Sequence, residues 1–132
     1  MDSISDQDLI AAAIEGGKHA YIPYSNYRVG AALLTASGEV YTGCNIENAG
    51  YSPTICAERT ALVKAVSEGH LSFTAVAVVT RDGGSPCGVC RQMMFEFSPT
   101  MKVLLADLDG NLRLTTTLAD LLPHGFGRAN LD

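Results

Sequence analysis

Three cysteines and one glutamate, carried on two short motifs, could together form a metal-dependent catalytic site. The motifs are Cys56-Ala57-Glu58 and Pro86-Cys87-Gly88-Val89-Cys90, and each lies at the start of a predicted helix. The free N–H groups and the dipole at a helix N-terminus favour thiolates, so the three sulfur atoms are suited to bind a cation. Three thiolates are a typical partial ligand set for zinc, which leaves a fourth position open for water.

Glu58 follows Cys56 by two residues, which places a carboxylate beside the metal without requiring it as a ligand. A carboxylate next to a zinc-activated water can take its proton and pass it to a leaving group. Cys44 could close the site as a fourth ligand, but it lies on a predicted strand, where it is most simply a buried cysteine. We therefore predict one Zn²⁺ held by Cys56, Cys87 and Cys90, with Glu58 as the catalytic group.

Two arginines are placed to offset the negative charge of such a site. Zinc with three thiolates is anionic, which raises the pKa of a bound water and opposes its activation. Arg59 follows Glu58 and Arg91 follows Cys90, so both are predicted to donate hydrogen bonds to the thiolates. The alternative is that both are surface arginines near helix starts, although the helix dipole disfavours a cation there.

The rest of the sequence predicts the elements that must position these motifs. Residues 73–80 form a continuous apolar run, which is typical of a buried central strand. The strand–helix–strand order that follows favours a parallel pair joined by a right-handed crossover, with helices over the sheet faces. Helices are expected at 5–20, 56–68, from 87 or 88 to 97, and at 118–122, and strands at 27–36, 39–44, 73–80, 101–106 and 112–116.

Length and composition exclude several classes of protein. The chain has 132 residues, which predicts a single domain over 1–132, and 47% of them are hydrophobic, which argues against disorder. The net charge of -5 disfavours nucleic acid and anionic membrane surfaces as partners. No apolar stretch approaches the length of a membrane span, and the acidic N-terminus is unlike a signal peptide. We therefore expect a cytoplasmic protein.

The sequence resembles the small, homotetrameric, zinc-dependent type of cytidine deaminase. The C-A-E and P-C-x-x-C motifs are similar to those of zinc nucleobase deaminases, and further matching stretches are P-Y-S-N-Y-R-V-G-A-A-L at 23–33, G-C-N-I-E-N-A at 43–49 and L-L-P from 121. The resemblance implies a three-layer α/β/α domain with a mixed five-stranded sheet. It also implies hydrolytic deamination of cytidine and deoxycytidine to uridine and deoxyuridine in pyrimidine salvage. In the mechanism that the resemblance implies, zinc-bound hydroxide attacks C4, Glu58 shuttles protons and ammonia is released.

The resemblance also assigns residues to the nucleoside pocket. Asn45 and Glu47 resemble the pair that holds the ribose 3′-hydroxyl, and their donor and acceptor groups suit that role. A loop-stabilising Asn and a solvated Glu are the alternative. Ala57 is placed among the substrate contacts as well. Tyr27 stands where the family usually has Phe, which keeps the aromatic wall but adds a hydroxyl that needs a partner.

Three further positions are expected to act across subunit interfaces. Ala49 and Tyr51 resemble residues that reach the 5′-hydroxyl of a neighbouring subunit's substrate. Phe126 resembles a C-terminal aromatic residue that stacks on the pyrimidine of a neighbour, although it could also be a core residue. The expected partner is therefore a second copy of the chain, in a homotetramer with shared active sites.

Other functions remain as alternatives. A blasticidin S deaminase shares the zinc motifs, but the ribose pair and Phe126 favour a plain nucleoside. Deaminases of deoxycytidylate or polynucleotides carry His in place of the first cysteine, whereas this sequence has Cys56, which argues against both substrates. A structural zinc module needs a fourth ligand and gives no role to Glu58. A thiol-redox protein built on Cys87 and Cys90 needs neither Cys56 nor Glu58, and zinc content distinguishes it.

Overall fold

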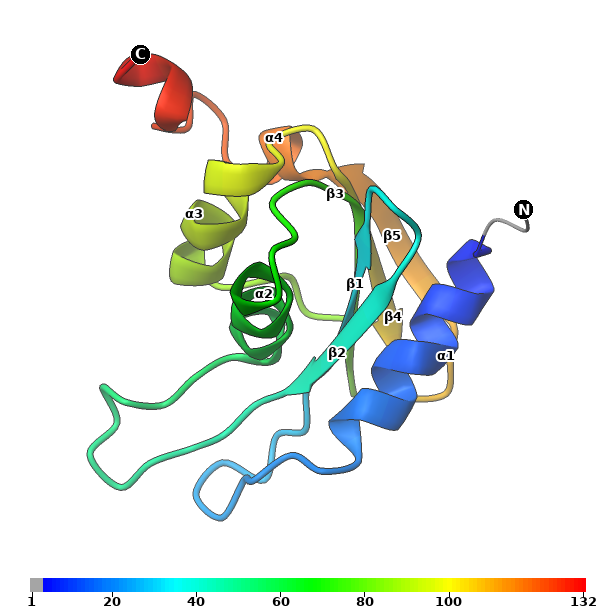
Figure 1. Ribbon diagram of the computed structural model, residues 1–132. Helices are drawn as coiled ribbons and strands as arrows, with labels where there is room; N and C mark the ends of the chain where they lie inside the picture. The colour runs from blue at the N-terminus through cyan, green and yellow to red at the C-terminus, as the bar shows by residue number, and fades with distance from the viewer. Residues whose placement is uncertain (1–3) are drawn as a thin grey trace.

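A five-stranded mixed sheet forms the centre of the computed structural model, which describes residues 4–132 (Figure 1). The strands are β1 (Gly30–Thr35), β2 (Val40–Cys44), β3 (Phe73–Thr80), β4 (Lys102–Asp107) and β5 (Leu112–Thr117). Their order is β2-β1-β3-β4-β5, in which β3 and β4 are parallel and the other pairs antiparallel. The predicted mixed sheet and its parallel pair are confirmed.

Helices cover both faces of the sheet and complete three layers (Figure 1). Helix α1 (Asp6–Gly17) lies on one face, α2 (Ala57–Ser67) and α3 (Gly88–Phe97) lie on the other, and α4 (Leu118–Leu121) packs against α3 and β5. The central strand β3 alternates between two cores. Val76 and Val78 pack in the cluster with Leu62 and Met94, whereas Ala77 packs with Leu9 and Ile10 of α1. Burial of both faces explains its continuous apolar sequence.

The predicted strand 27–36 begins three residues later, at Gly30, because a side chain takes over its first hydrogen bonds. Asn45 Nδ2 donates to the Tyr27 carbonyl at 2.8 Å, and the Val29 N–H donates to Asn45 Oδ1 at 3.1 Å. Residues 27–29 therefore run beside the sheet as part of the segment that reaches the site. The later start of β1 is a tertiary effect, which strand propensity alone does not predict.

The first helix begins as predicted but ends at Gly17 rather than near residue 20. Ser5 caps it in a capping box with Asp8, which fixes the start. The end coincides with close backbone packing of α1 on β1, since a Cβ added to Gly30 would lie 2.1 Å from the Ala13 carbonyl oxygen. Arg28 Nη1 donates to the Gly17 carbonyl at 2.6 Å and satisfies the end of the helix. A short 3-10 helix, Arg128–Asn130, was not predicted.

A second close approach brings the start of α2 to the end of β2. A Cβ added to Gly43 would lie 2.3 Å from the Ala57 carbonyl oxygen and 2.6 Å from the Ala61 nitrogen. Thr60 Oγ1 also donates to the Cys44 carbonyl at 3.0 Å. Glycine at this position therefore allows the first turn of α2 to rest on the sheet, which positions Cys56 and Glu58.

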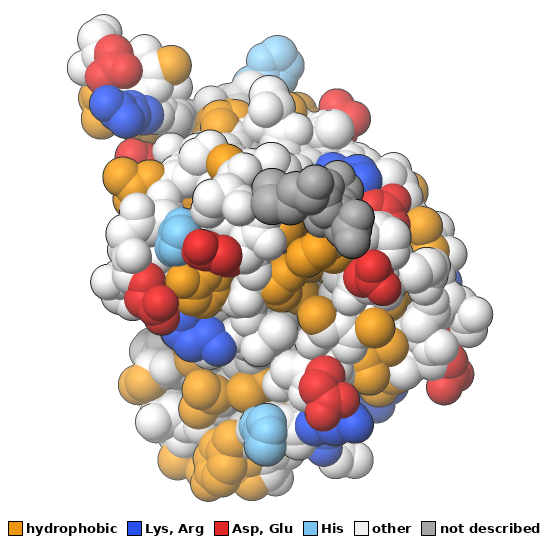
Figure 2. Space-filling view, turned by 45° about the vertical axis from the view of Figure 1, so that its right-hand side comes forward, with side chains coloured by type: hydrophobic (Ala, Val, Ile, Leu, Met, Phe, Trp, Pro, Cys, Tyr) orange, Lys and Arg blue, Asp and Glu red, His pale blue; other side chains and the backbone are white. Residues whose placement is uncertain are grey.

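The surface carries charges of both signs. On the face shown in Figure 2, acidic and basic side chains of the described residues are interspersed and form no continuous basic area. Within residues 4–132, none of the helices combines the length and apolar character that crossing a membrane requires.

Candidate active site

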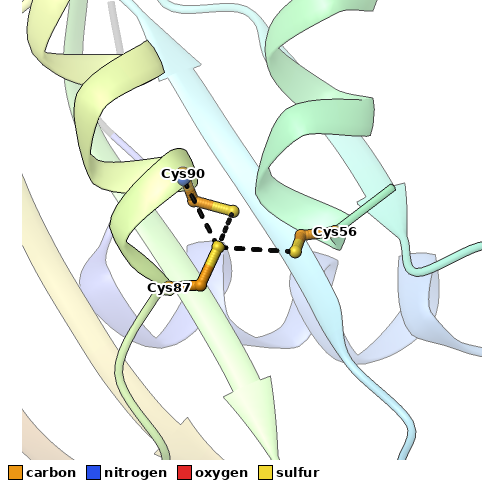
Figure 3. Close-up of side chains that lie close together, drawn as sticks. All are labelled: Cys56, Cys87 and Cys90. Atoms are coloured by element: carbon orange, nitrogen blue, oxygen red, sulfur yellow. Dashed lines mark hydrogen bonds between the residues drawn. The ribbon is translucent and has the colours of Figure 1, made fainter. Parts of the chain in front are cut away.

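The three predicted zinc ligands lie together at the starts of two helices (Figure 3). Cys56 is the N-cap residue of α2, Cys87 is the N-cap residue of α3, and Cys90 lies in the first turn of α3. The Sγ atoms of Cys56 and Cys87 are 3.7 Å apart, those of Cys87 and Cys90 are 3.2 Å apart, and all three lie within 4.8 Å of one another. Sulfur atoms about 3.8 Å apart are expected around a tetrahedral zinc with Zn–S bonds of about 2.3 Å, so the cluster fits this ion.

Cys44 does not belong to this cluster. Among the residues that the structure describes, the group of His, Cys, Asp and Glu side chains close enough to hold a metal consists of Cys56, Cys87 and Cys90. Cys44 ends β2 and is half-buried, so its predicted place on a strand is correct, whereas the prediction that it is buried is wrong. The site therefore offers three protein ligands, and the fourth position of a tetrahedral ion is open to water or substrate.

The protein stabilises negative charge on the Cys56 sulfur atom. The hydrogen bond with Cys90, followed by the one from Arg59 Nη2 at 3.3 Å, holds the pKa of Cys56 well below its usual range. The same contact with Cys56 raises the pKa of Cys90, so the first thiolate forms on Cys56. The Cys90 N–H donates to the Cys87 sulfur at 3.4 Å. The predicted contact between Arg59 and a thiolate is confirmed.

Arg91 donates no hydrogen bond to a sulfur atom within residues 4–132, and the prediction that it donates to a thiolate is wrong. Its Nε donates to the Pro86 carbonyl at 2.7 Å, Nη1 to the Leu121 carbonyl at 2.7 Å and Nη2 to Ser85 Oγ at 2.8 Å. The guanidinium donates to groups that the fold brings near α3 rather than to the cysteine cluster. Arg91 therefore fixes the segment that leads into Cys87, through the Pro86 carbonyl and the Ser85 hydroxyl.

Glu58 is the buried carboxyl group of the site. Its side chain is on the first turn of α2, the residue is 4% exposed, and Oε1 has no hydrogen-bond partner within the described chain. Burial raises the pKa of Glu58 to about 7, and the negative charge of Cys56 adds to this effect. A carboxyl group with a pKa near neutrality can both accept and release a proton, as general acid–base chemistry requires.

A cavity of about 440 Å³, the main cavity, is lined by Cys56, Cys87 and Glu58. Its size is within the range of small-molecule sites. Of the predicted site residues, Tyr27, Asn45, Glu47, Cys56, Glu58 and Cys87 line it. Ala57 is the first residue of α2, is fully buried and does not line the cavity, and Ala49 is exposed on the loop after β2.

Asn45 and Glu47 hold the loop that forms one wall of the cavity. Glu47 Oε1 accepts from the N–H groups of Tyr24 at 3.0 Å and Ser25 at 3.1 Å, while Oε2 accepts from the Ser25 hydroxyl. The bond from the Ser25 hydroxyl holds the pKa of Glu47 below its usual range. Glu47 is therefore an ionised acceptor at the cavity and also stabilises the loop, as Asn45 does through Tyr27 and Val29.

Sequence reasoning missed several polar cavity residues, namely Ser25, Thr54, Thr80 and Ser85. Thr80 carried a recognisable signal, because it is a polar last residue that follows the apolar run 75–79 of the central strand. Ligands in sheets of this class bind at the carboxyl ends of the parallel strands, where Thr80 lies. Ser25 and Ser85 lie in loops whose paths depend on distant contacts, so the sequence offered no comparable signal.

Tyr51 and Phe126 lie outside the main cavity of their own chain. Tyr51 is 76% exposed and lines a separate cavity of about 320 Å³, which shares Ser25, Glu47 and Thr54 with the main one. Phe126 is 57% exposed, and its carbonyl accepts from Gln92 Nε2 at 2.8 Å. The C-terminal segment that follows it projects away from the sheet, beyond α3 (Figure 1). Both aromatic side chains are thus available to contact another molecule.

Comparisons with known proteins agree with this geometry. The family model described as the cytidine and deoxycytidylate deaminase zinc-binding region matches residues 3–106. A protein named cytidine deaminase from Sporosarcina psychrophila is 51% identical over 128 residues, covering 95% of this chain and 93% of the relative. One from Halalkalibacterium halodurans is 50% identical over 123 residues, 91% of this chain and 92% of the relative. The crystal structure of cytidine deaminase from Burkholderia pseudomallei has a TM-score of 0.87 and 47% identity, covering 92% of this chain and 99% of that one.

Proposed function

Because this chain belongs to the cytidine deaminase family, we propose that its three clustered cysteines hold one zinc ion beside the buried carboxyl group of Glu58. The observation that carries this assignment is that Glu58 Oε1 has no hydrogen-bond partner within residues 4–132, while Glu58 lines the same cavity as Cys56 and Cys87. An isolated buried carboxyl oxygen is costly unless a ligand or ion completes its surroundings.

The chain is a zinc-dependent enzyme, and its reaction is the hydrolytic deamination of cytidine to uridine and ammonia. Zinc bound by the cysteines supplies a Lewis acid that lowers the pKa of water at the open ligand position. In our proposal, the oxygen of the attacking water bonds to C4, and Glu58 passes one of the water's protons to N3 of the base and the other to the 4-amino group. The C4–N bond then breaks, and ammonia leaves. Deoxycytidine is a second substrate in the same proposal, with a place in pyrimidine salvage.

The remaining cavity residues would orient the nucleoside. Asn45 retains one N–H that the loop does not use, and ionised Glu47 is a strong acceptor for a sugar hydroxyl. The Tyr27 ring supplies an aromatic wall for the base or sugar. Direct substrate contact by Ala57 requires its backbone, because its side chain is fully buried.

The substrate assignment is tested by incubating the zinc-loaded protein with cytidine, deoxycytidine and blasticidin S in parallel. We expect one ammonia per nucleoside consumed, together with the ultraviolet change of cytosine to uracil, for cytidine and deoxycytidine. Preferential turnover of blasticidin S would assign the cavity to that larger substrate instead. Absence of ammonia with all three compounds would contradict the proposed chemistry.

Arg59→Ala is expected to weaken zinc retention by about 10- to 100-fold, the range for partners outside the ligand set. Arg59 is the side chain that donates to the Cys56 sulfur, so its loss removes a compensating positive charge from an anionic site. Competition with a zinc chelator measures the change. Arg59→Lys is the matched control, because it retains the charge, and it should hold zinc better than Arg59→Ala. Equal zinc affinity in wild type and Arg59→Ala would show that this hydrogen bond does not matter.

We further propose that the chain assembles as a homotetramer in which neighbouring copies complete each site. Exposed Tyr51 and Phe126 support this arrangement, because a single chain leaves both aromatic side chains uncovered and outside its own main cavity. Exposed Ala49 lies on the same loop as Tyr51 and would reach a neighbour in the same way. Sites at interfaces also give a small domain the depth to bury a nucleoside.

Phe126→Ala is expected to raise KM by about 5- to 150-fold with little change in kcat, which corresponds to about 1–3 kcal/mol for a lost base–aromatic stack. Steady-state kinetics with cytidine measure the change. Leu131→Ala is the matched control, because Leu131 is 79% exposed on the same C-terminal segment. A fully active monomer in sedimentation experiments would refute shared sites, and it would leave the zinc chemistry unaffected.

Residues 1–132 would then form one catalytic domain, which agrees with a family match that extends over most of the chain. A reducing compartment such as the cytoplasm fits the site, since Cys56, Cys87 and Cys90 are close together as free thiols. Oxidation of any pair would remove ligands from the metal.

A further inference from the structure

The hydroxyl of Tyr27 connects two walls of the main cavity. Tyr27 Oη donates to Asp82 Oδ1 at 2.6 Å, although the two residues are 55 positions apart. The guanidinium carbon of Arg81 lies over the same ring, 4.9 Å from its centroid. Both partners belong to the loop of residues 81–87, which runs from the end of β3 to Cys87 at the start of α3. The sequence indicated that the Tyr27 hydroxyl needs a partner, and in the structure this partner is in the loop that ends at the proposed zinc ligand Cys87.

Asp82 is the centre of a compact hydrogen-bond network in that loop. Its Oδ1 also accepts from Thr80 Oγ1 at 3.1 Å and from the Gly84 N–H at 3.3 Å, and the Gly84 N–H reaches Thr80 Oγ1 at 2.8 Å. A Cβ added to Gly84 would lie 3.1 Å from Tyr27 Oη, so the backbone passes close to the ring. The bond from Tyr27 holds the pKa of Asp82 below its usual range, and an ionised acceptor strengthens such bonds.

The two ends of the loop are fixed by different side chains. At the Cys87 end, Arg91 holds the Pro86 carbonyl and Ser85 Oγ. At the β3 end, Tyr27 supplies a contact from the segment before β1, and that segment is itself held by Asn45 through the Tyr27 carbonyl. Tyr27 thus links the wall that carries Asn45 and Glu47 to the wall that carries Gly84, Ser85 and Cys87, all of which line the cavity.

We propose that the Tyr27 hydroxyl is a positioning group that fixes the 81–87 loop through Asp82, and thereby places Cys87 and the adjoining cavity wall for zinc and nucleoside. The inference rests on the proposed role of Cys87 as a zinc ligand. A phenol has one hydrogen to donate, and here Asp82 receives it. The hydroxyl therefore acts through the loop, while Tyr27 also lines the cavity. A Phe at this position would keep the ring and lose the tether.

The test uses the zinc-loaded protein and its Tyr27→Phe variant. We expect faster amide hydrogen exchange in residues 81–87, with the exchange of α1 and β4 unchanged. Zinc transfer to an excess of the chelator 4-(2-pyridylazo)resorcinol should accelerate by about 10-fold, the low end for losing a hydrogen bond to a charged group. A merely structural role would lower global stability and raise exchange throughout the sheet instead.

Companion variants assign the effect to the Tyr27–Asp82 pair. Asp82→Ala should reproduce the faster zinc release, and Asp82→Asn should restore much of the wild-type rate because it keeps an acceptor oxygen. The double variant Tyr27→Phe/Asp82→Ala should release zinc no faster than the Asp82→Ala single variant. Tyr21→Phe is the matched control, since the Tyr21 side chain is 56% exposed and its hydroxyl has no hydrogen bond within the described residues.

Wild-type rates of loop exchange and zinc release in Tyr27→Phe would overturn the proposal, and so would additive effects in the double variant. Failure of the proposed function has a different signature. If the wild-type protein holds no zinc, or holds it equally well after Cys87→Ala, then the ligand assignment is wrong. If zinc binding still depends on Cys87 but residues 81–87 exchange at the wild-type rate in Tyr27→Phe, then only the proposed role of the Tyr27 hydroxyl is wrong.

Discussion

Glu58→Gln protein is expected to bind zinc normally and to lose deaminase activity by about 10²- to 10⁴-fold, the range for removal of a general acid–base group. Glutamine preserves the size of the side chain but cannot accept and release a proton at the required position. Glu58 is 4% exposed, and its Oε1 makes no hydrogen bond within the described chain, so the substitution breaks no hydrogen bond of that atom. The neutral amide should therefore fit without disturbing the fold.

The measurements are kcat with cytidine and zinc content on the same preparation. Glu96→Gln is the matched control, because Glu96 is exposed on α3 and away from the main cavity. Its activity should equal that of the wild type. A Glu58→Gln protein with near-normal turnover would falsify the proton-transfer role. Loss of zinc along with activity would instead indicate that Glu58 acts on metal retention.

Cys87→Ala is expected to reduce zinc affinity by more than about 100-fold, which exceeds the effect of losing a partner outside the ligand set. Activity should fall with zinc content, because two remaining sulfur ligands cannot complete the site. Cys87 is the suitable cluster member to change, since it is exposed, whereas Cys90 is buried in the core. The folded state should therefore survive the substitution.

Metal analysis after dialysis against a chelator measures the expected loss from about one zinc per chain. Cys44→Ala serves as the control, because Cys44 is a cysteine of the same chain that lies outside the cluster. It should retain both zinc and activity. Equal zinc content in the two variants would contradict the three-cysteine site, and loss of zinc from Cys44→Ala alone would point to a different ligand set.

Residue types and spacing alone determined the chemistry of this site. The C-A-E and P-C-x-x-C motifs at two predicted helix starts predicted a cluster of three sulfur atoms with a nearby carboxylate. In the structure, Cys56 and Cys87 are the N-cap residues of α2 and α3. Short-range periodicity was sufficient here, because a helix start fixes the direction of the side chains at its first turn. The same local patterns gave all five strands, and the apolar run of β3 indicated its central place.

The tertiary structure alone decided how the loops around the three clustered cysteines are held. Arg59 and Arg91 occupy similar sequence positions after the two motifs, yet Arg59 donates to a sulfur and Arg91 to the carbonyl groups of Pro86 and Leu121. Tyr27 finds its partner in Asp82 only because β1 and β3 are neighbours in the sheet. A flexible side chain donates its hydrogen bonds to the acceptors that the fold brings near, and these often come from distant parts of the chain. Local propensity and motif spacing contain no information about those acceptors, so packing of the sheet, helices and loops had to be known first.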